Sequence, residues 1–126
     1  MTYPAKTLFV FGLYLLGLGT VLVLVPNLLL SVFSIPQTTE VWIRVVGMLV
    51  LFLGIYDVGA ARGNWTSFIA LSVPIRLSVI AFFAAFIFLA GAPAMLLLFG
   101  AVDFAFALWT WTALKAQSSP LPKGVA

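Results

Sequence analysis

The chain has 126 residues, of which 64% are hydrophobic and 7% are charged, and this composition excludes an ordinary soluble domain. It contains no cysteine and no histidine, which excludes disulfides, thiolate or imidazole metal sites, and Ser-His or Cys-His nucleophiles. The net charge of +3 comes from six basic and three acidic residues. Because the basic residues form no cluster that would follow a phosphate backbone, we expect no nucleic-acid partner.

Four long apolar segments predict transmembrane helices, at about residues 8–25, 41–61, 66–90 and 94–114. A bilayer core of about 30 Å needs roughly 20 apolar helical residues for each crossing. The apolar runs are continuous rather than alternating, which favours helices over a β-barrel. We therefore expect an all-α protein, with a four-helix antiparallel transmembrane bundle in residues 1–117 and a flexible cytoplasmic tail at 118–126.

The basic residues outside these segments predict the topology. The connections at about 26–40 and 91–93 carry none, whereas the two chain ends and the middle connection carry four. With four crossings these three regions lie on one side of the membrane, and the positive-inside rule places that side in the cytoplasm. We therefore expect a multi-pass protein with both termini cytoplasmic. The four residues are Lys6, Arg62, Lys115 and Lys123.

Residues 26–36 form an apolar connection bracketed by Pro26 and Pro36. The segment is too short to cross a bilayer, so it lies in the outer interface or folds back over the mouth of the bundle. An apolar loop on the lipid surface and a gating lid both fit this pattern. Just beyond it, Arg44 follows Glu40 by four residues, a spacing that favours an ion pair at the outer interface.

Two opposite charges fall at matching depth in the third and fourth segments. At about 1.5 Å of rise per residue, Arg76 lies about 15 Å from the inner boundary and Asp103 about 14 Å from the outer one. We therefore expect Arg76 and Asp103 to pair near the middle of the membrane. Asp57 lies only about 6 Å from the inner boundary, which makes it a second carboxylate on the cytoplasmic side.

The turn around Arg76 contains two further residues of interest. Pro74 removes a backbone donor within the third segment, and we expect a local break in the helix there. Ser72 lies one turn before Arg76 and is placed to help satisfy the backbone or the guanidinium. The candidate residues for a ligand or ion cavity are Arg76, Asp103, Asp57 and Ser72.

These buried charges have two interpretations. They line a polar cavity that binds a small ligand or relays an ion, or they form a structural ion pair that fixes the register of otherwise similar apolar helices. Without histidine or cysteine, the spacing of the remaining polar residues matches no catalytic motif. We therefore expect no enzyme activity, no catalytic residue, no metal and no cofactor.

Four stretches of the chain carry a resemblance to a known family. They are Pro-Asn-Leu-Leu at 26–29, Thr-Thr-Glu-Val-Trp-Ile-Arg at 38–44, and Leu-Phe-Gly-Ala-Val-Asp at 98–103 with Leu-Trp-Thr-Trp at 108–111. The pattern resembles small bacterial four-helix inner-membrane proteins described as DoxX-like. The resemblance implies a four-helix fold in a bacterial inner membrane and brings no established activity. Some DoxX-type proteins are subunits of quinone-linked oxidoreductases, but this chain supplies no redox centre.

Two functions follow as expectations. The first is a small membrane bundle that binds or passes a small solute, lipid or ion at its Arg/Asp cluster. The alternative is a non-catalytic structural or accessory subunit of a larger membrane complex. The expected partners are membrane lipid and either further copies of the chain or a larger membrane assembly.

Overall fold

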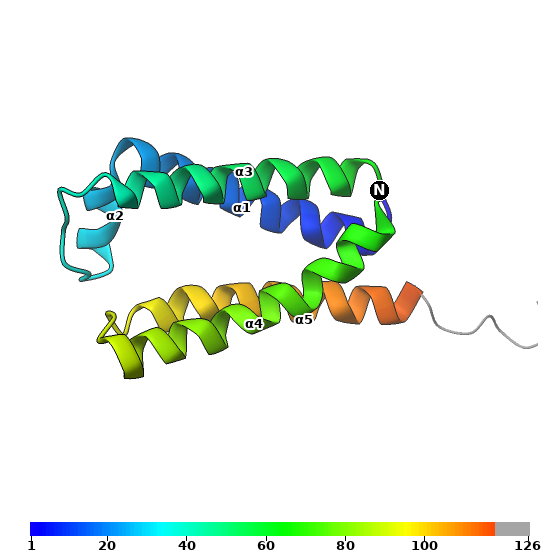
Figure 1. Ribbon diagram of the computed structural model, residues 1–126. Helices are drawn as coiled ribbons and strands as arrows, with labels where there is room; N and C mark the ends of the chain where they lie inside the picture. Colours follow the sequence, from blue (N-terminus) through cyan, green and yellow to red (C-terminus); the bar gives the residue numbers. More distant parts are fainter. Residues whose placement is uncertain (118–126) are drawn as a thin grey trace, which may run out of the picture.

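The computed structural model describes residues 1–117, and these fold into five α-helices without a strand among them (Figure 1). Four of the helices, α1, α3, α4 and α5, are each long and apolar enough to cross a membrane. The all-helical fold class is confirmed, and the predicted tail at 118–126 lies outside the described residues. The helices are α1 Tyr3–Leu24, α2 Pro26–Val32, α3 Trp42–Arg62, α4 Thr66–Ala90 and α5 Leu96–Gln117.

The first helix begins at Tyr3, five residues before the predicted start at residue 8. The side chain of Thr2 accepts a hydrogen bond from the backbone N–H of Ala5, and Pro4 occupies the first turn. Both features favour a helix start. The start of the helix is therefore determined by its capping residues, whereas the apolar run on which the prediction rested begins one turn later.

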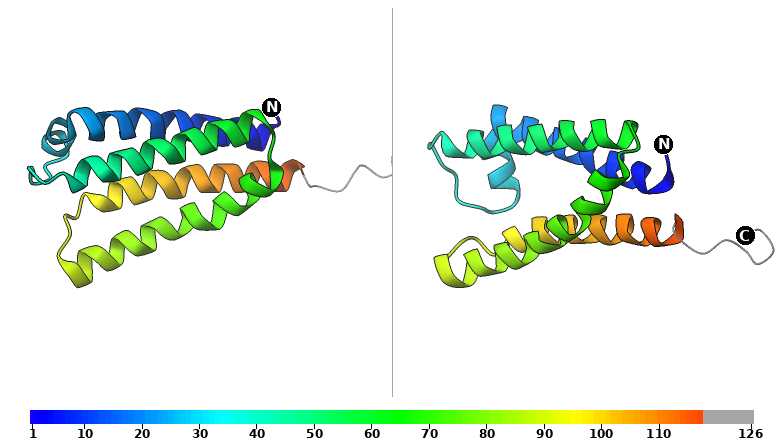
Figure 2. Two further views of the ribbon diagram at one scale, coloured as in Figure 1. Left: turned by 45° about the horizontal axis from the view of Figure 1, so that its top comes forward. Right: turned by 45° about the vertical axis from the view of Figure 1, so that its right-hand side comes forward.

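The long helices are arranged as two pairs. Helix α1 packs along α3, and α4 packs along α5 (Figures 1 and 2). Helix α1 also contacts α5, whereas α3 and α4 touch each other little beyond the turn that connects them. The interior of the protein is therefore tightly filled within each pair and more open between the pairs.

Glycines let α1 and α3 approach closely. A Cβ added at Gly19 of α1 would lie 2.6 Å from the backbone nitrogen of Leu51 in α3. A Cβ at Gly47 of α3 would lie 2.7 Å from the Cβ of Leu22 in α1. Small residues at such a contact allow the van der Waals packing that drives helix association in an apolar solvent. Any side chain larger than hydrogen at these positions forces the two helices apart.

The two pairs are joined where α1 meets α5. The hydroxyls of Thr7 and Thr110 share a hydrogen bond of 2.7 Å, and both side chains are completely buried. Near them, the Nε1–H of Trp109 donates to the hydroxyl of Tyr3 at 2.7 Å. A hydrophobic cluster fills the same end of the molecule. Its buried members are Ala5, Leu8, Phe11, Leu15, Ala60, Ala61 and Ile69.

The apolar connection predicted at 26–36 forms the short helix α2 and a turn that reaches across to the second pair. Pro26 is the first residue of α2, as its fixed φ favours. The side-chain amide of Asn27 donates to the carbonyl oxygen of Thr38 and accepts from its N–H, both at 2.9 Å. Phe33 packs against Phe99 of α5 with ring centroids 5.0 Å apart. The connection is therefore an ordered cover between the pairs at the end opposite the Thr7–Thr110 contact.

The predicted break at Pro74 is wrong, because α4 runs without interruption from Thr66 to Ala90. The ribbon of α4 changes direction near its middle instead (Figure 2). A proline removes one helix hydrogen bond and crowds the preceding turn, which bends a helix without necessarily ending it. In the turn before Pro74, the hydroxyl of Ser72 donates to the carbonyl oxygen of Ile69. The Nε–H of Arg76 donates to the carbonyl oxygen of Ser72. A serine hydroxyl that bonds to the preceding turn also favours a bend in the helix.

We predict that Gly19→Ala destabilises the protein by roughly 1–3 kcal/mol, as overpacking of a tight contact does. The matched control is Gly17→Ala, two residues away on α1, where an added Cβ meets nothing within 4 Å. In a helix this control change is expected to be neutral or to stabilise by up to about 1 kcal/mol. Thermal unfolding in mild detergent measures both. Equal melting temperatures for the two variants would show that the α1–α3 contact is not tight at Gly19.

Candidate functional site

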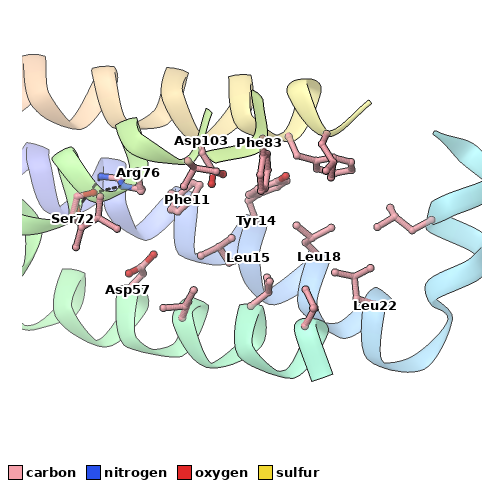
Figure 3. Close-up of a pocket in the computed structure, with 18 of the residues that line it drawn as sticks. Phe11, Tyr14, Leu15, Leu18, Leu22, Asp57, Ser72, Arg76, Phe83 and Asp103 are labelled. Atoms are coloured by element: carbon pink, nitrogen blue, oxygen red, sulfur yellow. Dashed lines mark hydrogen bonds between the residues drawn. The ribbon is translucent and has the colours of Figure 1, made fainter. Parts of the chain in front are cut away.

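A cavity of about 450 Å³ lies between the two helix pairs. All five helices contribute to its lining, and α2 contributes Leu29 and Leu30. This volume is within the range of about 300–1,000 Å³ that is usual for small-molecule sites. Figure 3 shows Leu15, Leu18 and Leu22 of α1 following one another along the cavity toward α2. The larger part of the wall is therefore hydrocarbon.

Polar side chains gather in one region of this wall. The predicted candidates Arg76, Asp57, Asp103 and Ser72 all line the same cavity, although they come from three different helices. Figure 3 shows Asp57 and Asp103 entering from opposite sides, on α3 and α5, with Arg76 and Ser72 on α4. The polar lining residues are Tyr14, Asp57, Ser72, Arg76 and Asp103, and we refer to these five as the polar cluster.

Arg76 is the most constrained member of the polar cluster. Only 5% of its surface is exposed. Its Nη2–H donates to the hydroxyl of Ser72 at 3.1 Å, and its Nε–H donates to the carbonyl oxygen of Ser72 at 3.4 Å. The guanidinium carbon lies 4.8 Å from the centroid of the Phe11 ring, a distance at which a cation is attracted to the face of the ring. Ser72 and Phe11 therefore hold the guanidinium in place.

One nitrogen of this guanidinium has no partner. Nη1 of Arg76 is buried and makes no hydrogen bond, and it is the one buried side-chain atom of this kind among residues 1–117. A buried donor without an acceptor is costly, and more so when it belongs to a charged group. Exceptions of this kind in a folded protein call for an explanation, such as a ligand or an ordered water molecule. The cavity beside Arg76 is where such an acceptor would lie.

The predicted direct ion pair between Arg76 and Asp103 is not formed. Within residues 1–117 neither Asp103 nor Asp57 lies within ion-pair distance of Arg76, whose hydrogen bonds go to Ser72 instead. Both carboxyl groups line the same cavity as the guanidinium. Ser72 is one helical turn away on the same helix, whereas the carboxylates lie on separate helices. The local contact with Ser72 forms, and the two carboxylates lie beyond ion-pair distance of Arg76.

The predicted ion pair between Glu40 and Arg44 is also not formed. The guanidinium of Arg44 donates to the carbonyl oxygens of Val23 and Leu24 at the end of α1. These are carbonyls that a helix end leaves without intrahelical partners, and a cation there also interacts favourably with the helix dipole. Helix α3 begins at Trp42, so Glu40 precedes it and the four-residue helical spacing does not apply.

Two aromatic residues of the site were not among the sequence-based candidates. Phe11 and Tyr14 lie one turn apart on α1, with ring centroids 5.9 Å apart, and both line the cavity. Tyr14 also stacks on Phe106 of α5 at 6.1 Å. Their spacing of three residues places them on one face of the helix. That spacing was the available signal, but α1 carries no buried charge that would have drawn attention to it.

The cavity is open on one side. Leu53 of α3 is 53% exposed, and Leu71 and Ile75 of α4 are 61% and 57% exposed, yet all three line the cavity. A residue that is both cavity-lining and exposed marks an opening. Since α3 and α4 make few contacts, this opening lies between them and is bordered by apolar side chains. We call it the α3–α4 opening.

We predict that Arg76→Leu lowers the stability of the protein by roughly 1–3 kcal/mol, because it leaves two buried carboxylates without a compensating cation. Adding Asp57→Asn to Arg76→Leu should restore part of that loss, since it removes one of the uncompensated charges. Ser72→Ala, which keeps all three charges, serves as the control and should cost less than Arg76→Leu. Melting temperatures in detergent measure the series. A double variant no more stable than Arg76→Leu would show that the three charges do not form one electrostatic unit.

Comparison of the chain with protein-family models, with curated proteins and with solved structures found no match.

Proposed function

We propose that this chain is a multi-pass membrane protein that binds a lipid-like small molecule in the cavity between its two helix pairs. The observation that carries this proposal is the guanidinium of Arg76: the residue lines an otherwise largely apolar cavity, and its buried Nη1 has no hydrogen-bond partner. Ligand sites are typically apolar pockets with a few polar groups that orient the ligand. The polar cluster supplies such groups, and the leucines toward α2 supply the apolar wall.

The proposed membrane arrangement is an antiparallel bundle of α1, α3, α4 and α5, with both termini in the cytoplasm. The length and apolar composition of these helices support insertion, and the distribution of basic residues supports the orientation. A bacterial inner membrane and membership of the DoxX-like proteins are part of the same proposal. Both are supported by the stretches at 26–29, 38–44, 98–103 and 108–111, which resemble those proteins.

The α3–α4 opening favours a lipid over an aqueous solute or an ion. Leu53, Leu71 and Ile75 at its border are apolar and exposed, so in a bilayer they face hydrocarbon. A molecule that enters between them comes from the membrane. A pathway for ions or water-soluble solutes would instead need polar groups toward both membrane surfaces, whereas the cavity wall toward α2 is formed by leucines.

The topology is tested by cysteine labelling, which is straightforward in a chain without native cysteine. We expect Gln37→Cys, in the exposed connection before α3, to react with an impermeant thiol reagent added to intact cells. Gln117→Cys, at the end of α5, should react only after the cells are opened. Labelling of Gln117→Cys in intact cells would overturn the proposed orientation.

Ligand binding is tested by filling the cavity. Val79 lines the cavity on α4, so Val79→Phe reduces its volume. The matched control is Leu89→Phe, on the same helix but outside the cavity and 86% exposed. We expect native mass spectrometry of protein released from mild detergent to show a bound lipid-like adduct for wild type and Leu89→Phe, and much less for Val79→Phe.

Solvent extraction followed by lipid analysis then identifies the class of molecule retained. Equal retention by Val79→Phe and Leu89→Phe would contradict binding in this cavity. It would favour the alternative in which the chain is an accessory subunit with lipid only on its outer surface.

A further inference from the structure

The hydrogen-bonding groups and charges of the polar cluster indicate which head group a ligand of the cavity carries. This inference rests on the proposed function. Nη1 of Arg76 is a donor without an acceptor. Arg76 lines the cavity and is 95% buried, since only 5% of its surface is exposed. Arginine carries five N–H donors and no acceptor. The ligand must therefore present a hydrogen-bond acceptor at the level of Arg76.

The charges around the cavity argue against an anionic ligand. The polar cluster holds one guanidinium and two carboxyl groups, those of Asp57 and Asp103. Both carboxyl groups line the cavity, and neither accepts a hydrogen bond from residues 1–117. A carboxylate or phosphate brought to Arg76 would add a further negative charge to a space of low dielectric constant, where like charges repel strongly. An arginine with two facing carboxylates is therefore a poor anion site.

The same carboxyl groups supply the acceptors that a donor on the ligand would need. A hydroxyl has one donor and two acceptor lone pairs, so it satisfies both sides of the cluster without bringing a charge. We propose that the cavity binds a neutral amphiphile with a hydroxyl head and a single hydrocarbon chain. The hydroxyl oxygen accepts from Nη1 of Arg76, and the hydroxyl proton is donated to the carboxylate of Asp57 or Asp103.

The depth of the polar cluster in the bilayer favours a ligand with an uncharged head group. Arg76 is ten residues from the start of α4, about 15 Å along the helix, so Arg76 lies near the middle of a bilayer, with Asp57 toward the cytoplasmic side. From there the leucines of α1 lead toward α2 (Figure 3). A phospholipid in the outer leaflet has the opposite polarity, with its charged head at the surface. A hydroxyl head is small and uncharged, and it reaches this depth at far lower cost than a charged group.

The test compares three probes that have the same length of hydrocarbon chain and differ in the charge of the head group. They are dodecanol, dodecanoate and dodecyltrimethylammonium. Delipidated protein in nanodiscs is titrated with each probe at pH 8, and saturable binding is measured by equilibrium dialysis of the radiolabelled compound. We expect dodecanol to bind at least about tenfold more tightly than either charged probe. The two carboxylates repel the head of dodecanoate, and the quaternary ammonium head offers no acceptor to Nη1 of Arg76.

Variants locate the head and the chain. Arg76→Lys keeps the charge but loses the planar fork that reaches Ser72 and the ligand together, so dodecanol should bind about tenfold more weakly. Val79→Phe should abolish saturable binding of dodecanol, and Leu89→Phe should leave it unchanged. Asp57→Asn removes one negative charge at nearly constant shape, so the preference for dodecanol over dodecanoate should decrease.

The outcomes separate the two proposals. Tighter binding of dodecanoate or of dodecyltrimethylammonium, removed by Val79→Phe, would overturn the neutral hydroxyl head and leave binding in the cavity intact. No saturable binding of any probe, or binding unaffected by Val79→Phe, would overturn both the head-group inference and the proposed function. A preference for dodecanol that persists in full in Arg76→Lys would show that Nη1 of Arg76 is not the donor.

Discussion

The contact between α1 and α5 at the end that carries the N-terminus determines the shape of the whole molecule. The buried hydrogen bond between Thr7 and Thr110 joins the two helix pairs there. The Tyr3–Trp109 hydrogen bond strengthens the same joint from the surface. In an apolar solvent a hydroxyl pair of this kind has little competition from water. Because the pairs are joined at this end and make few other contacts with each other, a cavity remains between them, and Arg76 is part of its wall.

The packing within the α1–α3 pair differs from the packing between the two pairs. Within α1 and α3, glycines such as Gly19 and Gly47 bring the backbones into contact, so this pair leaves no room for a ligand inside it. Between the pairs, contact is made by larger side chains and by α2 with its turn. The hydrogen bonds between Asn27 and Thr38 close that turn, and Phe33 anchors it on α5. The cavity thus lies between the pairs, outside the close contact of α1 with α3.

Much of the fold could be predicted from the sequence, because apolar runs of membrane-spanning length have few alternative structures. The four segments correspond to α1, α3, α4 and α5. Estimated depth placed Arg76 and Asp103 at one level and Asp57 toward the cytoplasmic side, and all three line one cavity. The partners of each charge could not be predicted. Arg76 contacts Ser72 and the ring of Phe11. Arg44 donates to carbonyl oxygens at the end of α1. A long flexible side chain has several partners within reach, and which one it meets depends on how the helices are rotated about their axes. Hydropathy contains no information on that rotation.

In the proposed membrane arrangement, the apolar border of the α3–α4 opening determines how binding in the cavity depends on the surrounding lipids. A molecule that enters between Leu53 and Ile75 moves its hydrocarbon chain from the lipid chains of the bilayer to the apolar wall of the cavity. Little hydrophobic driving force is available from this transfer. Selectivity then depends mainly on the few polar contacts around Arg76 and on the fit of the chain. Occupancy follows the mole fraction of the molecule among the surrounding lipids rather than its concentration in water. A minor membrane component is consequently outcompeted by bulk lipid unless its head satisfies the polar cluster.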